Sequence, residues 1–122
     1  MVECEASGLA FLPYFPLASG LLTGKYRRGK KPPEGSRAED AWGPKVFTEK
    51  NLAIVERLIE FAESCNHTLL DLAFAWLLVH KPVASVIAGA SKTEQIQANA
   101  KAVNWKLTSD DLAQIDAIMT AK

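Results

Sequence analysis

The residues whose types and spacing best suit ligand chemistry lie in Ser85–Asn99. Ser91 and Glu94 have the Ser-x-x-Glu spacing of a capping box, which predicts a helix with Ser91 as its N-cap. Gly89 permits a positive φ or a close approach of the backbone to a ligand. A helix that begins at this point directs free N–H groups and the positive end of its dipole toward the preceding turn, which favours an anion.

The residues before this turn predict a buried strand. Val86, Ile87 and Ala88 end an apolar run with β-branched residues, as expected for a parallel strand covered on both faces. Most strand–turn–helix junctions bind nothing, so a ligand site here needs support from the rest of the chain.

A second segment could supply that support. Leu9–Pro13 is a strand candidate that should end near Tyr14, because prolines cannot donate to a ladder. Pro16–Lys25 follows, and its small residues and glycines suit a loop that closely contacts a ligand. It is not a P-loop, since only three residues separate its last two glycines and Tyr26 stands where Ser or Thr is required.

Helices and one long loop make up most of the remaining chain. Tyr26–Lys45 is predicted to be a loop, and its basic cluster is more often a solvated surface than a binding site. Thr48 can cap an amphipathic helix that runs to about Ser64. Capping boxes beginning at Thr68 and at Thr108 predict two further helices, the first apolar nearly all round and therefore buried.

Alternation of two strands with helices predicts an α/β fold with a parallel sheet. Two parallel strands bury little and leave long apolar edges, so residues 1–122 should be one part of a larger α/β structure. The exposed edges also allow self-association.

Composition excludes several classes of partner. Fourteen basic and fourteen acidic residues cancel, which leaves no footprint for nucleic acid or an anionic membrane. Cys4 and Cys65 lack metal-ligand spacing, and nothing pairs His67 with His80, so we expect no metal site and surface positions for both histidines. The cysteine usage and the absence of a signal-like start fit a cytoplasmic protein.

Two motifs carry a family resemblance. Tyr14–Tyr26, Tyr-Phe-Pro-Leu-Ala-Ser-Gly-Leu-Leu-Thr-Gly-Lys-Tyr, closely resembles an aldo-keto reductase segment, and Val86–Asn99 resembles a later segment of that family. Leu-Ala-Phe-Ala-Trp-Leu-Leu at residues 72–78 also fits. The resemblance covers essentially the whole chain and is closest to the branch that contains the potassium-channel β subunits.

The resemblance implies a (β/α)₈ TIM barrel, of which residues 1–122 would form strands seven and eight with about four helices. This is the phosphate-binding part of such barrels. The family uses NADPH to reduce aldehydes and ketones to alcohols, so the implied ligands are NADP(H) and, in a complete barrel only, a carbonyl substrate.

The resemblance also implies twelve cofactor-binding residues. Tyr14 would stack on the nicotinamide. The pyrophosphate would be lined by Phe15, Pro16, Leu17, Ala18 and Ser19, and phosphates would pair with Lys25 and Arg37. The adenosine 2′-phosphate and adenine would be held by Gly89, Ser91, Gln95 and Asn99.

Physical chemistry supports these roles but leaves alternatives open. Lys and Arg neutralise phosphate, and Gln95 and Asn99 lie one helical turn apart on a shared face. The alternatives are that Gln95 and Asn99 are surface amides and Arg37 a loop charge; the two motifs together favour the cofactor role for Ser91, Gln95 and Asn99, and leave Arg37 evenly balanced. The family's Pro is Ala88 here, which loosens the turn, and the family's Glu is Ala98, which removes an acceptor for the adenine amino group.

The family's catalytic tetrad of Asp, Tyr, Lys and His lies on earlier strands, so we assign no catalytic residue. Tyr14, Tyr26, His67 and His80 lie in the wrong segments. We therefore expect a truncated C-terminal third of a reductase that is inactive alone, binds the cofactor weakly and prefers NADP(H) to NAD(H). The alternatives are a non-catalytic binding or interaction module and a helical fragment with no cofactor role.

Overall fold

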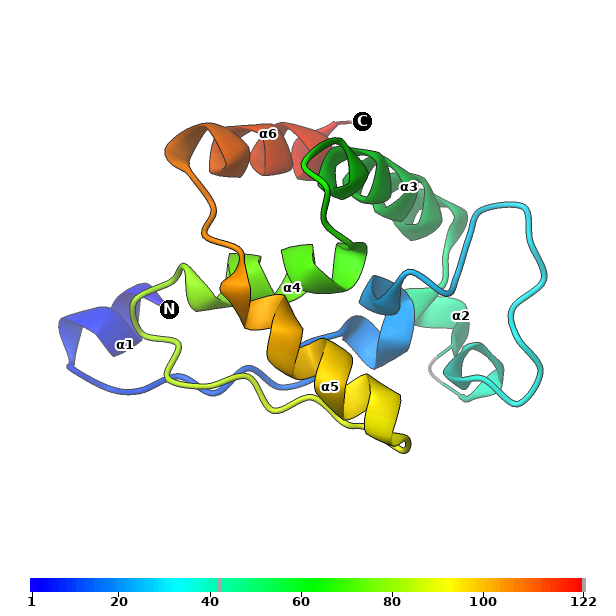
Figure 1. The fold of residues 1–122 in the computed structure, drawn as a ribbon, viewed down its shortest axis with the longest axis horizontal. Coiled ribbons are helices and arrows are strands. Elements are labelled where there is room, and N and C mark those ends of the chain that lie inside the picture. The colour runs from blue at the N-terminus through cyan, green and yellow to red at the C-terminus, as the bar shows by residue number, and fades with distance from the viewer. Residues whose placement is uncertain (42, 122) are drawn as a thin grey trace.

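The computed structural model describes residues 1–41 and 43–121. Over these residues the chain is mostly helical (Figure 1). The α-helices are α1 (Val2–Ala6), α2 (Gly43–Val46), α3 (Glu49–Ser64), α4 (Leu69–Leu78), α5 (Thr93–Lys101) and α6 (Ser109–Thr120), and the 3₁₀ helices are η1 (Ala18–Thr23), η2 (Arg37–Glu39) and η3 (Ala102–Asn104).

Three predicted helix starts are confirmed by their caps. The Thr48 side chain accepts from Asn51 N–H at 3.1 Å and begins α3. Thr68 and Asp71 form a reciprocal capping box at the start of α4, and Thr108 does the same for α6. Each cap satisfies N–H groups that have no partner inside the helix, which is why these starts can be predicted from sequence.

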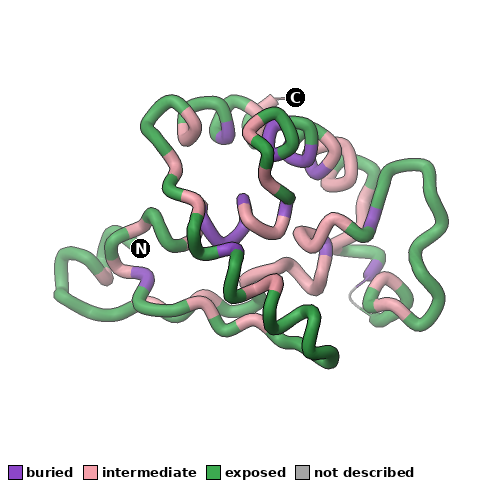
Figure 2. Tube along the Cα trace, in the orientation of Figure 1, coloured by how far each residue is buried: buried purple, intermediate pink, exposed green. Residues whose placement is uncertain are grey.

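The core lies where α3, α4, α6 and η1 meet. Buried positions concentrate on α3 and α4 (Figure 2). Two segments outside the helices, residues 9–14 and 83–90, are called the extended segments, and most of their residues, like most of α5, are exposed. The core side chains are Leu21, Val55, Leu58, Ile59, Phe61, Ala62, Leu69, Leu72 and Ile115. Helix α4 also contacts α5 and η3, so it links the core to α5 and to the turn that follows it.

Trp105 connects α6 to the rest of the core. Its ring stacks on His67 at 4.1 Å with an interplanar angle of 5°, and it lies 6.2 Å from the ring of Phe61. The predicted packing role of Trp105 is thus confirmed. His67 is half-buried by this stack, and His80 is half-buried against Trp76, so both histidines lie at the surface but are only partly exposed.

The predicted pair of strands is reduced to one parallel bridge in the described residues. Phe11 N–H donates to Pro82 C=O at 2.7 Å, and Ala84 N–H donates to Phe11 C=O at 3.2 Å. The next donor along the ladder would be Pro13, which has no N–H, so the pairing stops. Residues 84–90 have no regular secondary structure, and over residues 1–41 and 43–121 no strand longer than this bridge forms.

The predicted loop at residues 26–45 contains η2 and α2. Its first residues are hydrogen-bonded to α3, and the ring of Tyr26, where it begins, packs against the ring of Phe47, two residues after its end, at 4.3 Å. None of the helices over residues 1–41 and 43–121 has the length and apolarity needed to cross a bilayer.

Candidate functional site

A cleft of about 410 Å³ lies where the loop around η1 approaches the entry to α5. One wall is built by residues that follow the first extended segment, and the other by residues that follow the second. Because the two segments run parallel and are bridged at Phe11 and Val83, the residues that follow each of them emerge on the same side.

Nine of the twelve predicted cofactor residues line this cleft. They are Phe15, Pro16, Leu17, Ser19, Lys25, Arg37, Gly89, Ser91 and Gln95. Tyr14, Ala18 and Asn99 lie outside the lining. The fold thus brings together residues up to 80 positions apart in sequence, from Phe15 to Gln95.

Four further residues line the cleft and were missed from sequence: Gly20, Thr23, Ala88 and Ala90. Thr23 has a structural task, since its hydroxyl donates to Gly20 C=O at 2.7 Å and closes the end of η1. Ala88 and Ala90 flank Gly89. Their small size and their position beside a predicted ligand residue could have predicted that they line the cleft.

The wall around η1 has an unusual backbone. Phe15, Ala18 and Ser19 have φ values of 54°, 47° and 58°, in the left-handed region that non-glycine residues rarely occupy. Tight turns hold them there, including Ala18 N–H to Phe15 C=O and Gly20 N–H to Leu17 C=O, both at 2.9 Å. Backbone held in such regions is common at ligand sites, where it fixes the direction of N–H groups.

Two cations reach the cleft from different elements. Lys25 and Arg37 are exposed at its lining. The Nζ of Lys25 lies 5.0 Å above the ring of Tyr26, which is itself 2% exposed and supports the Lys25 stem. Gly20 lies beneath both side chains, since a Cβ there would be 3.7 Å from Lys25 Cε and 3.5 Å from Tyr26 Cε2. This arrangement favours an anion in the cleft.

The start of α5 differs from the predicted capping box. Lys92, not Ser91, is the N-cap, and Glu94 makes no box with Ser91. Gln95 reaches back instead, and its Oε1 accepts from Ser91 N–H at 2.8 Å, from Lys92 N–H at 3.2 Å and from Ser91 Oγ at 3.3 Å. A phosphate at this helix end would have to compete with the Gln95 amide oxygen for those donors.

Tyr14 lies just outside the cleft. Its side chain is 87% exposed and its ring contacts that of Phe15 at 4.3 Å, with 40° between the planes. Asn99 follows Gln95 by one turn of α5 and is half-buried. Both residues are beside the cleft lining, so their predicted contacts with a nicotinamide and an adenine stay predictions.

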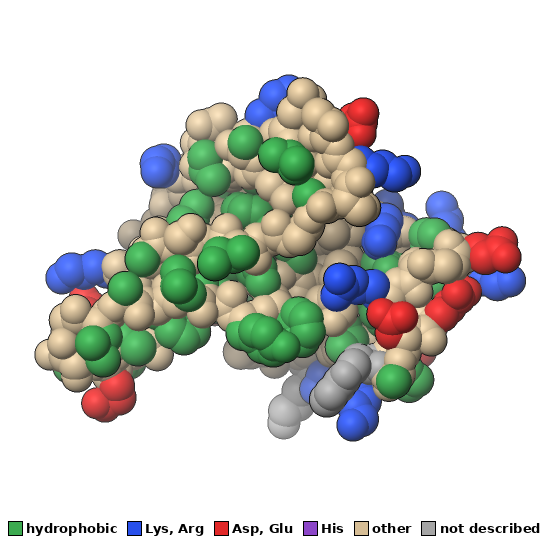
Figure 3. Space-filling view, turned by 90° about the horizontal axis from the view of Figure 1, so that it is seen from below, with side chains coloured by type: hydrophobic (Ala, Val, Ile, Leu, Met, Phe, Trp, Pro, Cys, Tyr) green, Lys and Arg blue, Asp and Glu red, His purple; other side chains and the backbone are tan. Residues whose placement is uncertain are grey.

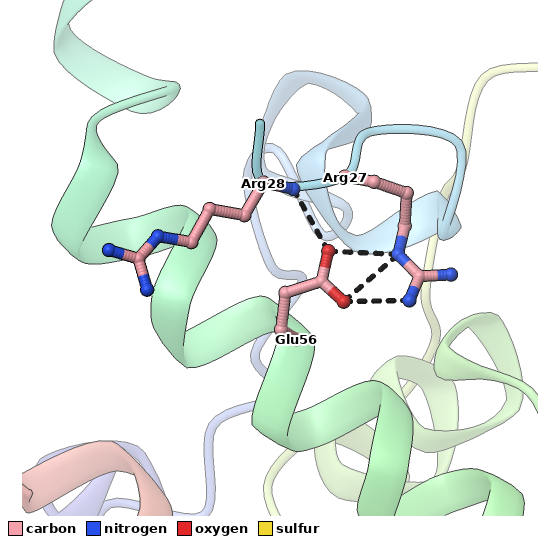
Figure 4. Close-up of polar contacts among 3 residues, drawn as sticks. All are labelled: Arg27, Arg28 and Glu56. Carbon is pink, nitrogen blue, oxygen red and sulfur yellow. Dashed lines mark hydrogen bonds and ion pairs between the residues drawn. The ribbon is translucent and has the colours of Figure 1, made fainter. Parts of the chain in front are cut away.

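The segment after Lys25 is fastened to α3 by one carboxylate (Figure 4). Glu56 Oε1 accepts from Arg27 Nε at 2.8 Å and from Arg28 N–H at 2.9 Å, and Glu56 Oε2 accepts from Arg27 Nη2 at 2.7 Å. The hydrogen bonds from Arg27 lower the pKa of Glu56 to about 2 and raise that of Arg27. This part of the basic cluster is therefore paired rather than freely solvated.

Other residues considered from sequence lie away from the cleft. Among residues 1–41 and 43–121, no group of three His, Cys, Asp or Glu side chains converges as a metal site would require. Cys4 and Cys65 are half-buried free thiols. Tyr26 is buried beneath Lys25 rather than exposed to a substrate.

Comparison with known proteins defines the class of this chain. A sequence profile of the Aldo/keto reductase family matches residues 3–120. The chain belongs to the aldo/keto reductase family.

Curated relatives come from several branches of that family. An L-glyceraldehyde 3-phosphate reductase of Escherichia coli is 37% identical over 118 residues, which cover 92% of this chain and 34% of the relative. A putative voltage-gated potassium channel subunit beta of Schizosaccharomyces pombe is 41% identical, with coverages of 85% and 32%. An NADH-specific methylglyoxal reductase of Escherichia coli is 33% identical, with coverages of 88% and 33%.

The fold also matches a solved structure, that of a glycerol dehydrogenase from Gluconobacter oxydans. The TM-score is 0.77 at 31% identity, and the match covers 95% of this chain and 36% of the other. The chain therefore spans about a third of the length of the relatives it matches.

Proposed function

We propose that this chain is the cofactor-binding C-terminal part of an aldo-keto reductase barrel, corresponding to strands seven and eight with their helices. The observation that carries the proposal is the convergence of nine predicted cofactor residues on one cleft. Eight of these residues come from two sequence motifs that the fold could have left apart, and Arg37 comes from the segment between them.

The cleft suits the phosphate groups of a nicotinamide dinucleotide. Lys25 and Arg37 supply positive charge, and a guanidinium can bind phosphate through two parallel hydrogen bonds. The small residues Ser19 and Gly20 in the lining allow close approach of a pyrophosphate, although the N–H groups of Ala18 and Gly20 are already used within the turns. When bound, the cofactor would supply the hydride, and these residues would hold and orient it.

Reduction of a carbonyl also needs a general acid beside the reacting oxygen. We propose that this acid and its partners lie on the part of the barrel that precedes residue 1, and that the present chain alone is inactive. Measurable aldehyde reduction by the purified chain, abolished by removal of NADPH, would contradict this assignment.

We propose NADP(H) as the cofactor, since the cleft carries two cations that a 2′-phosphate could use. The NADH-specific relative shows that a protein of this family can select the other cofactor. The hydrogen bonds of Gln95 to Ser91 and Lys92 would oppose a phosphate at the start of α5, so the preference rests mainly on Lys25 and Arg37.

Isothermal titration calorimetry of the chain with NADPH and with NADH tests the cofactor assignment. We expect weak binding because only part of the barrel is present, and tighter binding of NADPH than of NADH. Lys25→Gln should weaken NADPH binding by about tenfold, since a charge-assisted hydrogen bond to phosphate is worth about 1.5–3 kcal/mol. Lys50→Gln on the exposed surface of α3 is the control and should change nothing.

Sub-micromolar NADPH binding by this chain would contradict the proposal that the site is incomplete. Equal loss of affinity in the Lys25 and Lys50 variants would mean that net charge, rather than the cleft, determines binding.

A second function is supported by the surface of the molecule. The solvent-accessible area is 8209 Å². A folded monomer of 13.3 kDa should expose about 6,500 Å², so this chain exposes about 1,700 Å² more. Stable interfaces bury about 800 Å² on each partner, so the excess suffices for association with a second chain. We therefore retain an interaction module as the alternative to a cofactor-binding segment.

A further inference from the structure

Glu56 accepts hydrogen bonds from two consecutive loop residues, Arg27 and Arg28, which directly follow the Tyr26 ring beneath Lys25. Arg27 lies side-on to the carboxylate, while the amide of Arg28 meets the same carboxylate from the loop backbone (Figure 4). The side chain of Glu56 is 23% exposed and that of Arg27 is 42% exposed. The pair is thus partly withdrawn from solvent and has the bidentate geometry that makes such pairs effective.

The loop has a second, weaker attachment to α3. Arg28 Nε donates to Glu49 Oε2 at 3.0 Å, but these side chains are 59% and 74% exposed. A single bond between two exposed side chains contributes little to order. Glu56 therefore dominates the attachment of this part of the loop to α3.

Lys25 lies between a glycine turn at Gly24 and the residues that Glu56 binds. On one side Gly24 turns the chain with φ of 84°, and on the other Tyr26 is buried and Arg27 is bound by Glu56. Lys25 itself is exposed, with its Nζ 5.0 Å from the centre of the Tyr26 ring. Its position at the cleft consequently depends on how firmly residues 26 and 27 are held.

We propose that Glu56 is a positioning residue for the cofactor cleft: by holding Arg27 and the amide of Arg28 on α3, it keeps Lys25 directed at the bound phosphate. This proposal rests on the proposed function for its ligand. Glu56 does not line the cleft, so it acts through Lys25 and not by contact.

Charge and positioning predict opposite effects for Glu56→Gln. If Glu56 acts only through the electrostatic potential at the cleft, removal of its negative charge should tighten the binding of NADPH, which is an anion. If positioning matters, Lys25 gains freedom that binding must remove, and NADPH binding should weaken by about two- to tenfold, the cost of ordering one long side chain. Glu49→Gln removes the same charge from the same helix and is the matched control, with no weakening expected.

The test is a double-mutant cycle on NADPH binding, with Glu56→Gln, Lys25→Gln and the two combined. We expect Glu56→Gln to weaken binding in the parent chain and to have no effect once Lys25 is already Gln. Equal weakening in both backgrounds, or tighter binding in the parent, would overturn the proposal. Arg27→Gln breaks the same attachment from the loop side and should reproduce the result if Glu56→Gln fails to fold.

A second readout needs no ligand. The ¹⁵N heteronuclear NOE of the Lys25 amide should fall in Glu56→Gln and stay unchanged in Glu49→Gln. An unchanged value in Glu56→Gln would refute positioning. If the parent chain binds no NADPH while the NOE falls as expected, the proposed function fails and the attachment of Lys25 through Glu56 stands.

Discussion

At the scale of single residues, two glycines near the cleft have different reasons to be glycine. Gly24 has φ of 84°, which an L side chain rarely adopts, and a Cβ there would be 3.9 Å from Leu69. Gly89 is not in the left-handed region, and a Cβ there would meet nothing within 4 Å. Of these two positions, the fold requires a glycine only at Gly24. At Gly89 the chain itself has room for a Cβ, so a glycine there needs another reason, such as close approach of a ligand.

Substitution by alanine should separate stability from binding at these two positions. Gly24→Ala should destabilise the chain by about 1–2 kcal/mol, the cost of a left-handed conformation for a residue with a Cβ. Gly89→Ala should leave stability unchanged but weaken NADPH binding, because the methyl group occupies space at the cleft lining. Urea denaturation and calorimetry measure the two effects, and unchanged binding by Gly89→Ala would contradict close approach of the cofactor there.

Glu56 gives a pH dependence whose sign follows from its pKa. The folded-state pKa is lowered to about 2 from a usual value of 4.5, so the contribution to stability is present above about pH 4.5 and is lost as the pH falls toward 2. Solvent screening limits that contribution to about 1 kcal/mol. Urea denaturation from neutral to acidic pH should show Glu56→Gln less stable than the parent at pH 7, with the difference shrinking in acid. A difference that is constant with pH would contradict this ionic role.

At the scale of elements, local capping chemistry determines how much of the fold can be predicted. Thr48, Thr68 and Thr108 each satisfy a backbone N–H three residues ahead, so the sequence is sufficient to place the starts of α3, α4 and α6. The start of α5 was misplaced by one residue because two candidate partners compete. Gln95 Oε1 accepts from the N–H groups of both Ser91 and Lys92, and thereby takes the place that the Ser-x-x-Glu spacing assigned to Glu94.

The cap of α4 should have a measurable effect on the whole fold, because α4 carries five buried residues. Thr68→Ala removes the acceptor for Asp71 N–H and should cost about 0.5–2 kcal/mol of stability. Thr93→Ala, at the exposed first position of α5, is the control and should cost much less. Thermal or urea denaturation checks both, and equal losses would argue against a specific role of the cap.

At the scale of the whole molecule, the chain covers only part of its apolar surface. The face that carries the two extended segments and α5 shows hydrophobic side chains across its centre and left, with charged side chains gathered mainly at the right (Figure 3). Leu12 and Ile87 on these segments are 55% and 69% exposed. The sequence predicts both segments, and over residues 1–41 and 43–121 they are paired only by the bridge between Phe11 and Val83, since two strands alone are marginally stable.

An exposed apolar face predicts association of the isolated chain. Sedimentation velocity should show a larger species as the concentration rises. Ile87→Lys should shift this equilibrium toward monomer, because it places a charge on the edge. Ser85→Lys adds the same charge to the same segment without removing apolar area and is the control. A monomer at every concentration would contradict self-association through this face.

Most residues of the candidate site could be predicted from residue type and motif. The residues that support them could be found only in the structure. Lys25 and Ser91 could be proposed from sequence because cations and a helix start suit phosphate. The burial of Tyr26 under Lys25 and the bond from Glu56 to the loop could not, since both depend on the path of the chain between residues 26 and 56. Sequence spacing carries no information on such a path.

Binding of one dinucleotide between the two segments is tested most directly by a ¹H–¹⁵N correlation spectrum of the chain titrated with NADPH. We expect concentration-dependent shifts concentrated in residues 15–25 and 88–95, with α6 unaffected. Shifts confined to other surfaces, or none at saturating NADPH, would contradict the proposal that these two segments bind one dinucleotide between them.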